Sequence, residues 1–167
     1  SAAPNTVVYT MGFEAGEDFS GYSVVDVDGD GFVSDIATTY SRSGSACLRF
    51  PVPGGATADN WVITNCFDLA SGVGYTLDFW YKIFDVAPFI PYTLEAYIGN
   101  STDISMMTLV ALTPTPTDTM YQRSNQYFTV PSSGIYYIAF RASGAPVELS
   151  TRIDDITVDF AVGINNP

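Results

Sequence analysis

The sequence contains no histidine, and only one of its six basic residues is a lysine, Lys82. Without imidazole, Ser-His-Asp and Cys-His catalytic arrangements are impossible, and zinc sites with histidine ligands are excluded. No apolar run approaches the roughly 20 residues of a membrane-spanning helix, and the sequence shows no signal peptide. We expect that Ser1–Pro4 is a trimmed start from which a targeting segment has been removed.

Positive charge is scarce, and the formal net charge is −12. Such a surface repels phosphate backbones and anionic membranes, so we expect no nucleic-acid partner and no membrane insertion. A hydrophobic content of 47% and an aromatic content of 14% exclude disorder. The length of 167 residues predicts one domain over 1–167. We expect it to be monomeric in isolation, with Gly163–Pro167 beginning a linker.

Short runs of β-branched and aromatic residues fill the sequence, and Gly, Pro, Asn, Ser and Asp cluster between them. No segment has a sustained helical period. In Tyr75–Phe84, Leu77, Phe79 and Tyr81 alternate onto one face, as in a half-buried strand. About nine strands in one domain predict an all-β, two-sheet antiparallel sandwich or a barrel. The expected strands are Val7–Tyr9, Ala46–Val52, Trp61–Phe67, Tyr75–Phe84, Tyr92–Ile98, Thr108–Leu112, Gln126–Val130, Ile135–Arg141 and Arg152–Phe160.

Residues 26–31 read Asp-Val-Asp-Gly-Asp-Gly and place carboxylates at Asp26, Asp28 and Asp30. Alternating oxygen ligands before a glycine suit Ca²⁺, which takes six to eight oxygens. A helix–loop–helix calcium site is excluded, because Ala37 stands where the bidentate glutamate is required. We therefore predict a calcium loop completed from elsewhere in the chain. The alternative is a solvated acidic turn, since Asp-Gly pairs are ordinary turn chemistry.

The two cysteines are Cys47 and Cys66. If Ala46–Val52 and Trp61–Phe67 form a hairpin, the two cysteines face one another at a separation that a disulfide tolerates. We favour this disulfide, because an acidic, lysine-poor all-β chain is typical of export. The alternative is two small buried side chains in a reducing compartment.

Three more carboxylates are candidate metal ligands: Glu14, Asp154 and Asp155. By strand alternation, Asp154 shares the face of Ile156 and Val158 and is expected to point inward, where a carboxylate needs a cation or strong donors. The first and last strands of sandwiches often lie side by side, which would bring Glu14 close to Asp154. For Asp154 the alternative is an ion pair with one of the few arginines. For Asp155 the alternative is an outward strand charge or a partner for Arg152.

Taken in order, six short segments resemble the cleaved-adhesin and choice-of-anchor J group of secreted bacterial jelly-roll domains, which are similar in build to carbohydrate-binding modules. The resemblance covers about residues 12–160. Its segments are Gly12–Glu14, Asp26–Gly31, Asp59–Thr64, Tyr75–Tyr81, Tyr136–Arg141 and Ile153–Ile156.

The resemblance implies a jelly-roll β-sandwich with structural Ca²⁺, which is exported and carried within a larger surface or secreted protein. By motif, it implies that the metal ligands are Glu14, Asp26, Asp28, Asp30, Asp154 and Asp155. The sequence lacks the tryptophan that is common before the acidic loop, since Tyr22–Val25 stands there.

The expected function is that of a non-catalytic, extracellular adhesin or carbohydrate-binding accessory module. The clustered carboxylates resemble cation ligands, and the isolated ones show no pairing pattern for glycoside hydrolysis. A sugar ligand needs outward aromatic residues with polar neighbours, whereas Trp61 and Phe79 are expected in the core. The alternative is a structural spacer or a domain that docks a host or cell-surface protein. The aromatic candidates for ligand binding are Trp80, Tyr92, Tyr97, Tyr121 and Tyr136.

Overall fold

Extended strands make up almost all of the regular structure in a computed structural model that describes residues 3–51, 57–84, 92–113, 120–144 and 150–162. Within these ranges there are twelve strands and one 3-10 helix, η1 (Ile104–Met106). The strands are β1 (Tyr9–Met11), β2 (Ser23–Asp26), β3 (Asp35–Ala37), β4 (Cys47–Pro51), β5 (Ala58–Ile63), β6 (Phe67–Leu69), β7 (Tyr75–Phe84), β8 (Tyr92–Gly99), β9 (Thr108–Leu112), β10 (Gln122–Phe128), β11 (Gly134–Gly144) and β12 (Ser150–Phe160).

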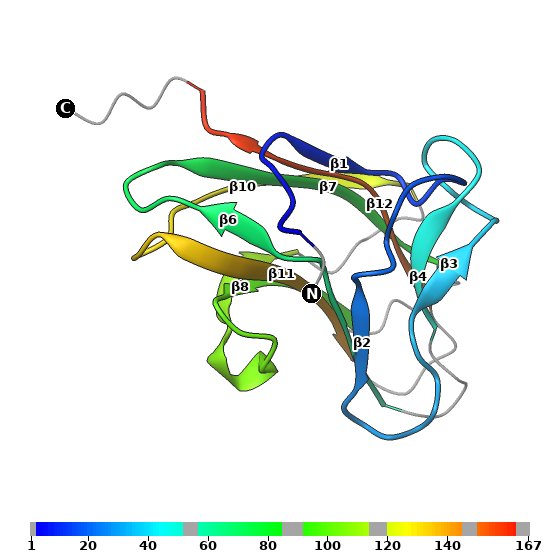
Figure 1. Cartoon of the computed structure of the whole chain (residues 1–167). Helices are drawn as coiled ribbons and strands as arrows, with labels where there is room; N and C mark the ends of the chain where they lie inside the picture. Colours follow the sequence, from blue (N-terminus) through cyan, green and yellow to red (C-terminus); the bar gives the residue numbers. More distant parts are fainter. Residues whose placement is uncertain (1–2, 52–56, 85–91, 114–119, 145–149, 163–167) are drawn as a thin grey trace.

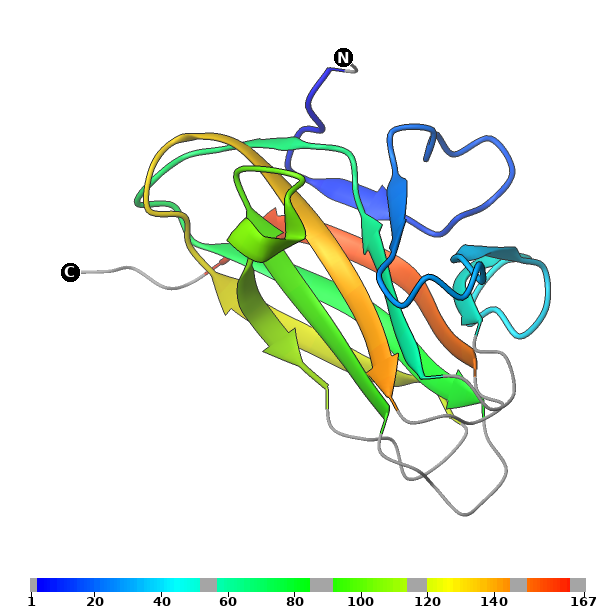
Figure 2. The ribbon, with the colours of Figure 1, turned by 90° about the horizontal axis from the view of Figure 1, so that it is seen from below.

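The strands form two six-stranded sheets that face one another (Figures 1 and 2). The first sheet has the order β10-β7-β12-β4-β3, with β1 paired to β12. The second has the order β2-β5-β11-β8-β9, with β6 paired to β11. The predicted two-sheet antiparallel sandwich is confirmed. The expected number of about nine strands was too low, because short strands such as β2, β3 and β6 span only three or four residues and give little alternation to read.

One large hydrophobic core fills the space between the sheets. Leu77, Phe79 and Tyr81 of β7 all point into it, as their alternation predicts. Phe79 meets Phe140 of β11 edge to face, with ring centroids 5.1 Å apart. Burying each such ring contributes about 1.5–3 kcal/mol, which stabilises the packing of β7 against β11.

The first and last strands lie side by side, as expected: Met11 of β1 faces Ile156 of β12 in antiparallel register. The face of Asp154 differs from the prediction. The β7–β12 register shifts after Asp154, and Asp155 has a φ of 48°. Because this bulge interrupts the alternation, Asp154 lies opposite Trp80 on the outer face of the sheet.

The hairpin that would join the cysteines is absent from the described strands. β4 lies in the first sheet and β5 in the second, so Cys47 does not face Cys66 across a ladder. Both cysteines are buried and free. The disulfide prediction was therefore wrong, because adjacency in sequence was taken for pairing in one sheet.

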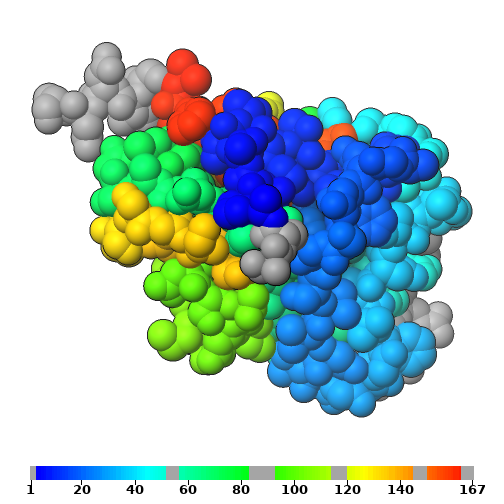
Figure 3. Space-filling view, viewed as in Figure 1, coloured from blue at the N-terminus to red at the C-terminus, as the bar shows by residue number. Residues whose placement is uncertain are grey.

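Three loops lie on the right-hand side of the sandwich in Figure 1: 12–22 after β1 and 38–46 after β3 at its upper edge, and 27–34 after β2 at its lower edge. In the space-filling view these blue to cyan segments form the right-hand part of the molecule (Figure 3). Among the described residues, no helix has the length and apolarity needed to span a membrane. The expected linker, residues 163–167, lies outside the described residues.

Candidate functional site

The acidic loop folds around its own carboxylates. Oxygen atoms of Asp26, Asp28 and Asp30 lie within 4.8 Å of one another. Asp26 accepts hydrogen bonds from the backbone N–H groups of Gly29 and Gly31, each at 2.9 Å. Both glycines have positive φ, at 72° and 83°, a conformation that glycine adopts without strain. The sequence therefore preforms a tight turn with three convergent carboxylates.

A hard cation fits this donor set. Asp30 Oδ2 is buried and has no hydrogen-bond partner, and a carboxylate oxygen in that state is costly without a positive charge nearby. Burial raises the pKa of Asp28, whereas the backbone N–H of Gly31 lowers the pKa of Asp26. Three carboxylate ligands in a glycine turn suit Ca²⁺, which binds oxygen.

The acidic loop is tied to the second sheet through β5. The backbone N–H of Asp59 donates to Asp28 Oδ2 at 2.6 Å, and the N–H of Val27 donates to the Asp59 carbonyl at 3.0 Å. The Asp59 carboxylate accepts hydrogen bonds from Arg141, at 2.7 and 2.9 Å, and from Trp61 Nε1, at 3.2 Å. The position of the loop thus depends on a network across β5 and β11.

Glu14 holds a different loop, residues 41–46. Its carboxylate accepts hydrogen bonds from the N–H and hydroxyl of Ser45, both at 2.8 Å, and from the N–H of Ala46 at 3.0 Å. These bonds, led by the Ser45 hydroxyl, lower the pKa of Glu14. Gly44, with a φ of 56°, lies so close to Glu14 that a Cβ atom there would overlap the carboxylate. A side chain at this position would therefore displace the Glu14 carboxylate from its hydrogen bonds.

Asp154 and Asp155 hold the same loop from β12. Asp154 is fully buried and accepts from the backbone N–H groups of Arg42, at 2.7 Å, and Ser43, at 3.2 Å. Burial raises the pKa of Asp154. Asp155 receives Arg42 Nη1 and the Ser43 hydroxyl, both at 2.6 Å. Backbone donors, rather than a buried ion pair, therefore satisfy the buried carboxylate.

The six predicted metal ligands do not form one cluster. The only group of three or more candidate ligands among the described residues is Asp26, Asp28 and Asp30. Glu14, Asp154 and Asp155 instead bind the loop 41–46, which Figure 1 shows on the opposite edge from the loop after β2. Glu14 and the last strand thus meet at one loop, as their expected proximity implies, whereas the acidic loop contacts β5. One metal site shared by all six residues stays a prediction.

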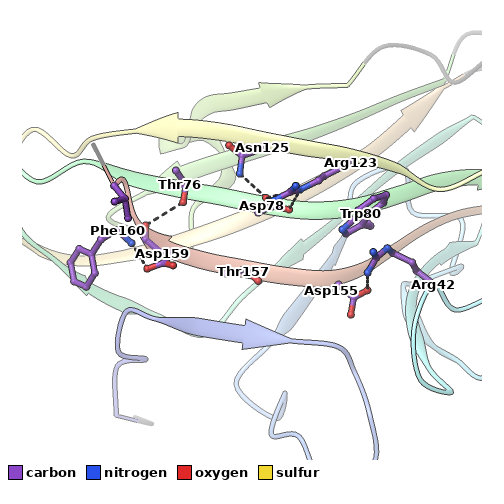
Figure 4. Close-up of a pocket in the computed structure, with 11 residues that line it drawn as sticks. Arg42, Thr76, Asp78, Trp80, Arg123, Asn125, Asp155, Thr157, Asp159 and Phe160 are labelled. Carbon is purple, nitrogen blue, oxygen red and sulfur yellow. Dashed lines mark hydrogen bonds and ion pairs between the residues drawn. The ribbon is translucent and has the colours of Figure 1, made fainter. Parts of the chain in front are cut away.

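An open groove of about 550 Å³ lies on the outer face of the first sheet, across β10, β7 and β12. Figure 4 shows Trp80 and Arg42 at one end and Phe160 at the other. Its volume is in the range of small-molecule sites. The lining residues are Arg42, Thr76, Asp78, Trp80, Arg123, Asn125, Asp155, Thr157, Asp159, Phe160 and Val162.

A polar cluster occupies the middle of the groove. The Asp78 carboxylate accepts hydrogen bonds from Arg123 Nε, at 2.9 and 3.0 Å, from Arg123 Nη2 at 2.5 Å, and from Asn125 Nδ2 at 2.6 Å. Burial alone would raise the pKa of Asp78, but the bonds from Arg123 and Asn125 hold it below its usual value. This carboxylate is therefore ionised and fixed at neutral pH.

The guanidinium group of Arg42 is stacked on the ring of Trp80. Arg42 Cζ lies 3.7 Å from the ring centroid of Trp80, within cation–π range. Asp155 binds the same guanidinium at 2.6 Å, and the Arg42 side chain stays 35% exposed. The groove thus ends in a flat aromatic and guanidinium stack, held by the loop 41–46.

Three of the other predicted aromatic residues do not line this groove. Tyr97 is half-buried against Trp61, with ring centroids 4.8 Å apart. Tyr121 is half-buried and donates its hydroxyl to the Tyr40 carbonyl at 2.8 Å. Tyr136 is 5% exposed and packs in the main core. The side chain of Tyr92 lies outside the described residues.

Sequence reasoning identified Trp80 and missed its polar neighbours. Asp78 could have been found, since it alternates with Trp80 on the face of β7 opposite the core residues. Arg123 and Asn125 had no such signal, because they reach the groove through the pairing of β10 with β7. Arg42 had none either, because it reaches the groove from the loop 41–46.

Comparisons with known proteins support the fold only. No protein-family model matches the chain, and no curated protein matches it. The K1 cleaved adhesin domain of Lys-gingipain from Porphyromonas gingivalis W83 is similar, with a TM-score of 0.73 and 21% identity over 94% of this chain and 99% of that one. A CBM61 module in complex with β-1,4-galactotriose has a TM-score of 0.62 and 17% identity, over 90% and 94%. The CBM22-1 xylan-binding domain of Paenibacillus barcinonensis Xyn10C has a TM-score of 0.64 and 13% identity, over 95% and 97%. At these identities the likeness shows a shared architecture: the chain has the two-sheet β-sandwich fold of cleaved adhesin domains and carbohydrate-binding modules.

Proposed function

We propose that this chain is a non-catalytic, calcium-stabilised, extracellular adhesin or carbohydrate-binding module of a larger secreted or surface protein. The observation that carries the proposal is the groove on the first sheet. It combines the Trp80 ring and the Arg42 guanidinium stacked on it with fixed carboxylate, amide and guanidinium groups. These fixed groups belong to Asp78, Asn125 and Arg123. Sugars present an apolar ring face and a rim of hydroxyl groups, and this combination of side chains suits both.

The calcium part of the proposal rests on the acidic loop. Asp26, Asp28 and Asp30 would hold the ion, which supplies positive charge to three converging carboxylates. Because the loop is tied to β5 through Asp59, an ion bound only by the folded loop would stabilise the edge of the second sheet.

The structural neighbours support a binding role by analogy of fold. Two are named as adhesin domains of a larger protein, and others are named for binding galactotriose or xylan. The absence of histidine from the sequence removes the most common hydrolytic arrangements. Because one fold hosts many functions, the binding role has to be tested at the groove and does not follow from the fold.

The direct test is a glycan array probed with the purified chain in Ca²⁺ and in excess chelator. We expect binding in Ca²⁺ that Trp80→Ala abolishes. Phe32→Ala is the matched control, since it removes an exposed aromatic ring from the loop between β2 and β3. If no glycan binds below millimolar concentration, the alternative of a spacer or a protein-docking domain replaces this proposal.

A further inference from the structure

We infer that the groove takes an uncharged oligosaccharide of more than one ring, recognised through pairs of adjacent hydroxyl groups. This inference rests on the proposed function and deepens it by naming the class of glycan. Three features of the groove carry it: its charge balance, the arrangement of its donors and acceptors, and its length.

The charge balance disfavours acidic sugars. Both guanidinium groups of the groove already have carboxylate partners, since Arg42 binds Asp155 at 2.6 Å and Arg123 binds Asp78 at 2.5 Å. Asp159 then leaves one further negative charge in the lining. An anionic sugar would meet guanidinium groups whose charge these carboxylates already balance, and it would meet the field of a chain with net charge −12. A neutral sugar meets neither barrier.

The polar groups are arranged to bind hydroxyl pairs. A sugar hydroxyl both donates and accepts, so two neighbouring hydroxyls match an acceptor placed beside a donor. Asp78 accepts from Arg123 and Asn125, which places carboxylate oxygens next to guanidinium and amide groups. Arg123 uses Nε and Nη2 toward Asp78 and keeps its side chain 57% exposed. The guanidinium thus stays oriented by Asp78 while its surface faces the groove.

The second pair repeats this arrangement next to an aromatic ring. Arg42 is stacked on Trp80 and bound by Asp155, so a flat surface lies beside a carboxylate. A sugar ring can lie against the flat surface while its hydroxyls meet Asp155 and the guanidinium edge.

The groove is longer than one sugar ring. Trp80 and Thr76 lie four residues apart on β7, which corresponds to roughly 14 Å along a strand. Phe160 marks the far end, where it lies opposite Tyr75 in the β12–β7 ladder. Thr157 lines the stretch between the two ends, and Thr76 lies beside Asp159 near Phe160. A chain of linked rings along β7 would use both ends, whereas a monosaccharide would reach only one.

Calorimetric titration with matched ligands tests the inference. The probes are β-1,4-galactotriose and xylotriose as neutral chains, trigalacturonic acid as an acidic chain, and galactose as a single ring. We expect at least one of the two neutral trisaccharides to bind about tenfold more tightly than trigalacturonic acid and about tenfold more tightly than galactose. Arg123→Gln and Asn125→Ala should each weaken the binding of that trisaccharide about tenfold, the loss expected for one good hydrogen bond to a charged or fixed polar group.

Arg49→Gln is the control for Arg123→Gln, because Arg49 forms an exposed ion pair with Asp35 on β3 and does not line the groove. Tryptophan fluorescence locates the ligand independently. Trp80 lines the groove and Trp61 lies in a cluster of the second sheet, so Trp80→Phe should remove any fluorescence change on binding.

The outcomes separate the inference from the proposed function. Tighter binding of trigalacturonic acid would overturn the inference and leave glycan binding intact. The inference would also be overturned if Arg123→Gln and Asn125→Ala left the affinity for the neutral trisaccharide unchanged, because the ligand would then bind outside the groove. If no glycan on the array binds at all, the proposed function fails first and the inference with it.

Discussion

Replacing Asp154 by alanine should destabilise the protein strongly, although Asp154 lies on the outer face of its sheet. Its carboxylate is fully buried and accepts three backbone N–H groups, from Arg42 at 2.7 Å, Asp155 at 2.8 Å and Ser43 at 3.2 Å. Leaving a buried donor without a partner costs about 1–3 kcal/mol. Because the loop can relax and admit water, the three losses do not add fully. We expect a loss of about 3–5 kcal/mol in the free energy of unfolding.

Urea denaturation at pH 7 measures this loss. With a slope of about 2 kcal/mol per molar urea, the midpoint should fall by roughly 2 M. Asp154→Asn keeps one side-chain oxygen as an acceptor, so its loss should be about half as large. Release of the loop should also free Arg42 from the Trp80 ring, which changes the fluorescence of Trp80 in the folded state.

Asp159→Ala is the matched control, since it removes a carboxylate from the same strand. Asp159 accepts from the N–H of Phe160, an exposed contact, and its loss should cost less than about 1 kcal/mol. A loss below about 1 kcal/mol for Asp154→Ala, or one equal to that of the control, would refute the view that this carboxylate fixes the loop.

Three further predictions concern the metal, the thiols and pH. Excess chelator should lower the melting temperature of the protein, and Asp30→Asn should remove that sensitivity, because Asp30 has the unpartnered oxygen of the acidic loop; an unchanged melting temperature would count against calcium. Thiol titration should find no reactive thiol in the native protein and two in denaturant, since Cys47 and Cys66 are buried and free; a bridge would leave none. The folded-state pKa of Asp78 lies below the ordinary 3.8, so the stability from its contact with Arg123 is complete above that pH and is lost as pH falls through the folded pKa. The difference in urea midpoint between the unmodified protein and Asp78→Asn should therefore be the same at pH 7 and at pH 5.

The sequence by itself determined the class of fold and the inner face of the principal strand. In β7 every second residue from Leu77 to Tyr81 is apolar, and a strand turns successive side chains to opposite faces. The acidic loop was equally readable, because Asp26, Asp28 and Asp30 bond to backbone groups only a few residues away. Both features depend on interactions between near neighbours in the chain.

Only the tertiary structure determined which side chains from distant parts of the chain lie close together. One positive φ at Asp155 makes a bulge that turns Asp154 to the outer face, and no alternation pattern encodes such an interruption. The passage of the chain between sheets after β4 separates Cys47 from Cys66. The groove brings together Asp78, Asn125 and Asp159 because β7 pairs with both β10 and β12, and Asp155 holds Arg42 of the loop 41–46 beside them. Strand order and register are set by the burial of whole faces and by long-range pairing, so a site built across three strands appears only when the sheet has formed.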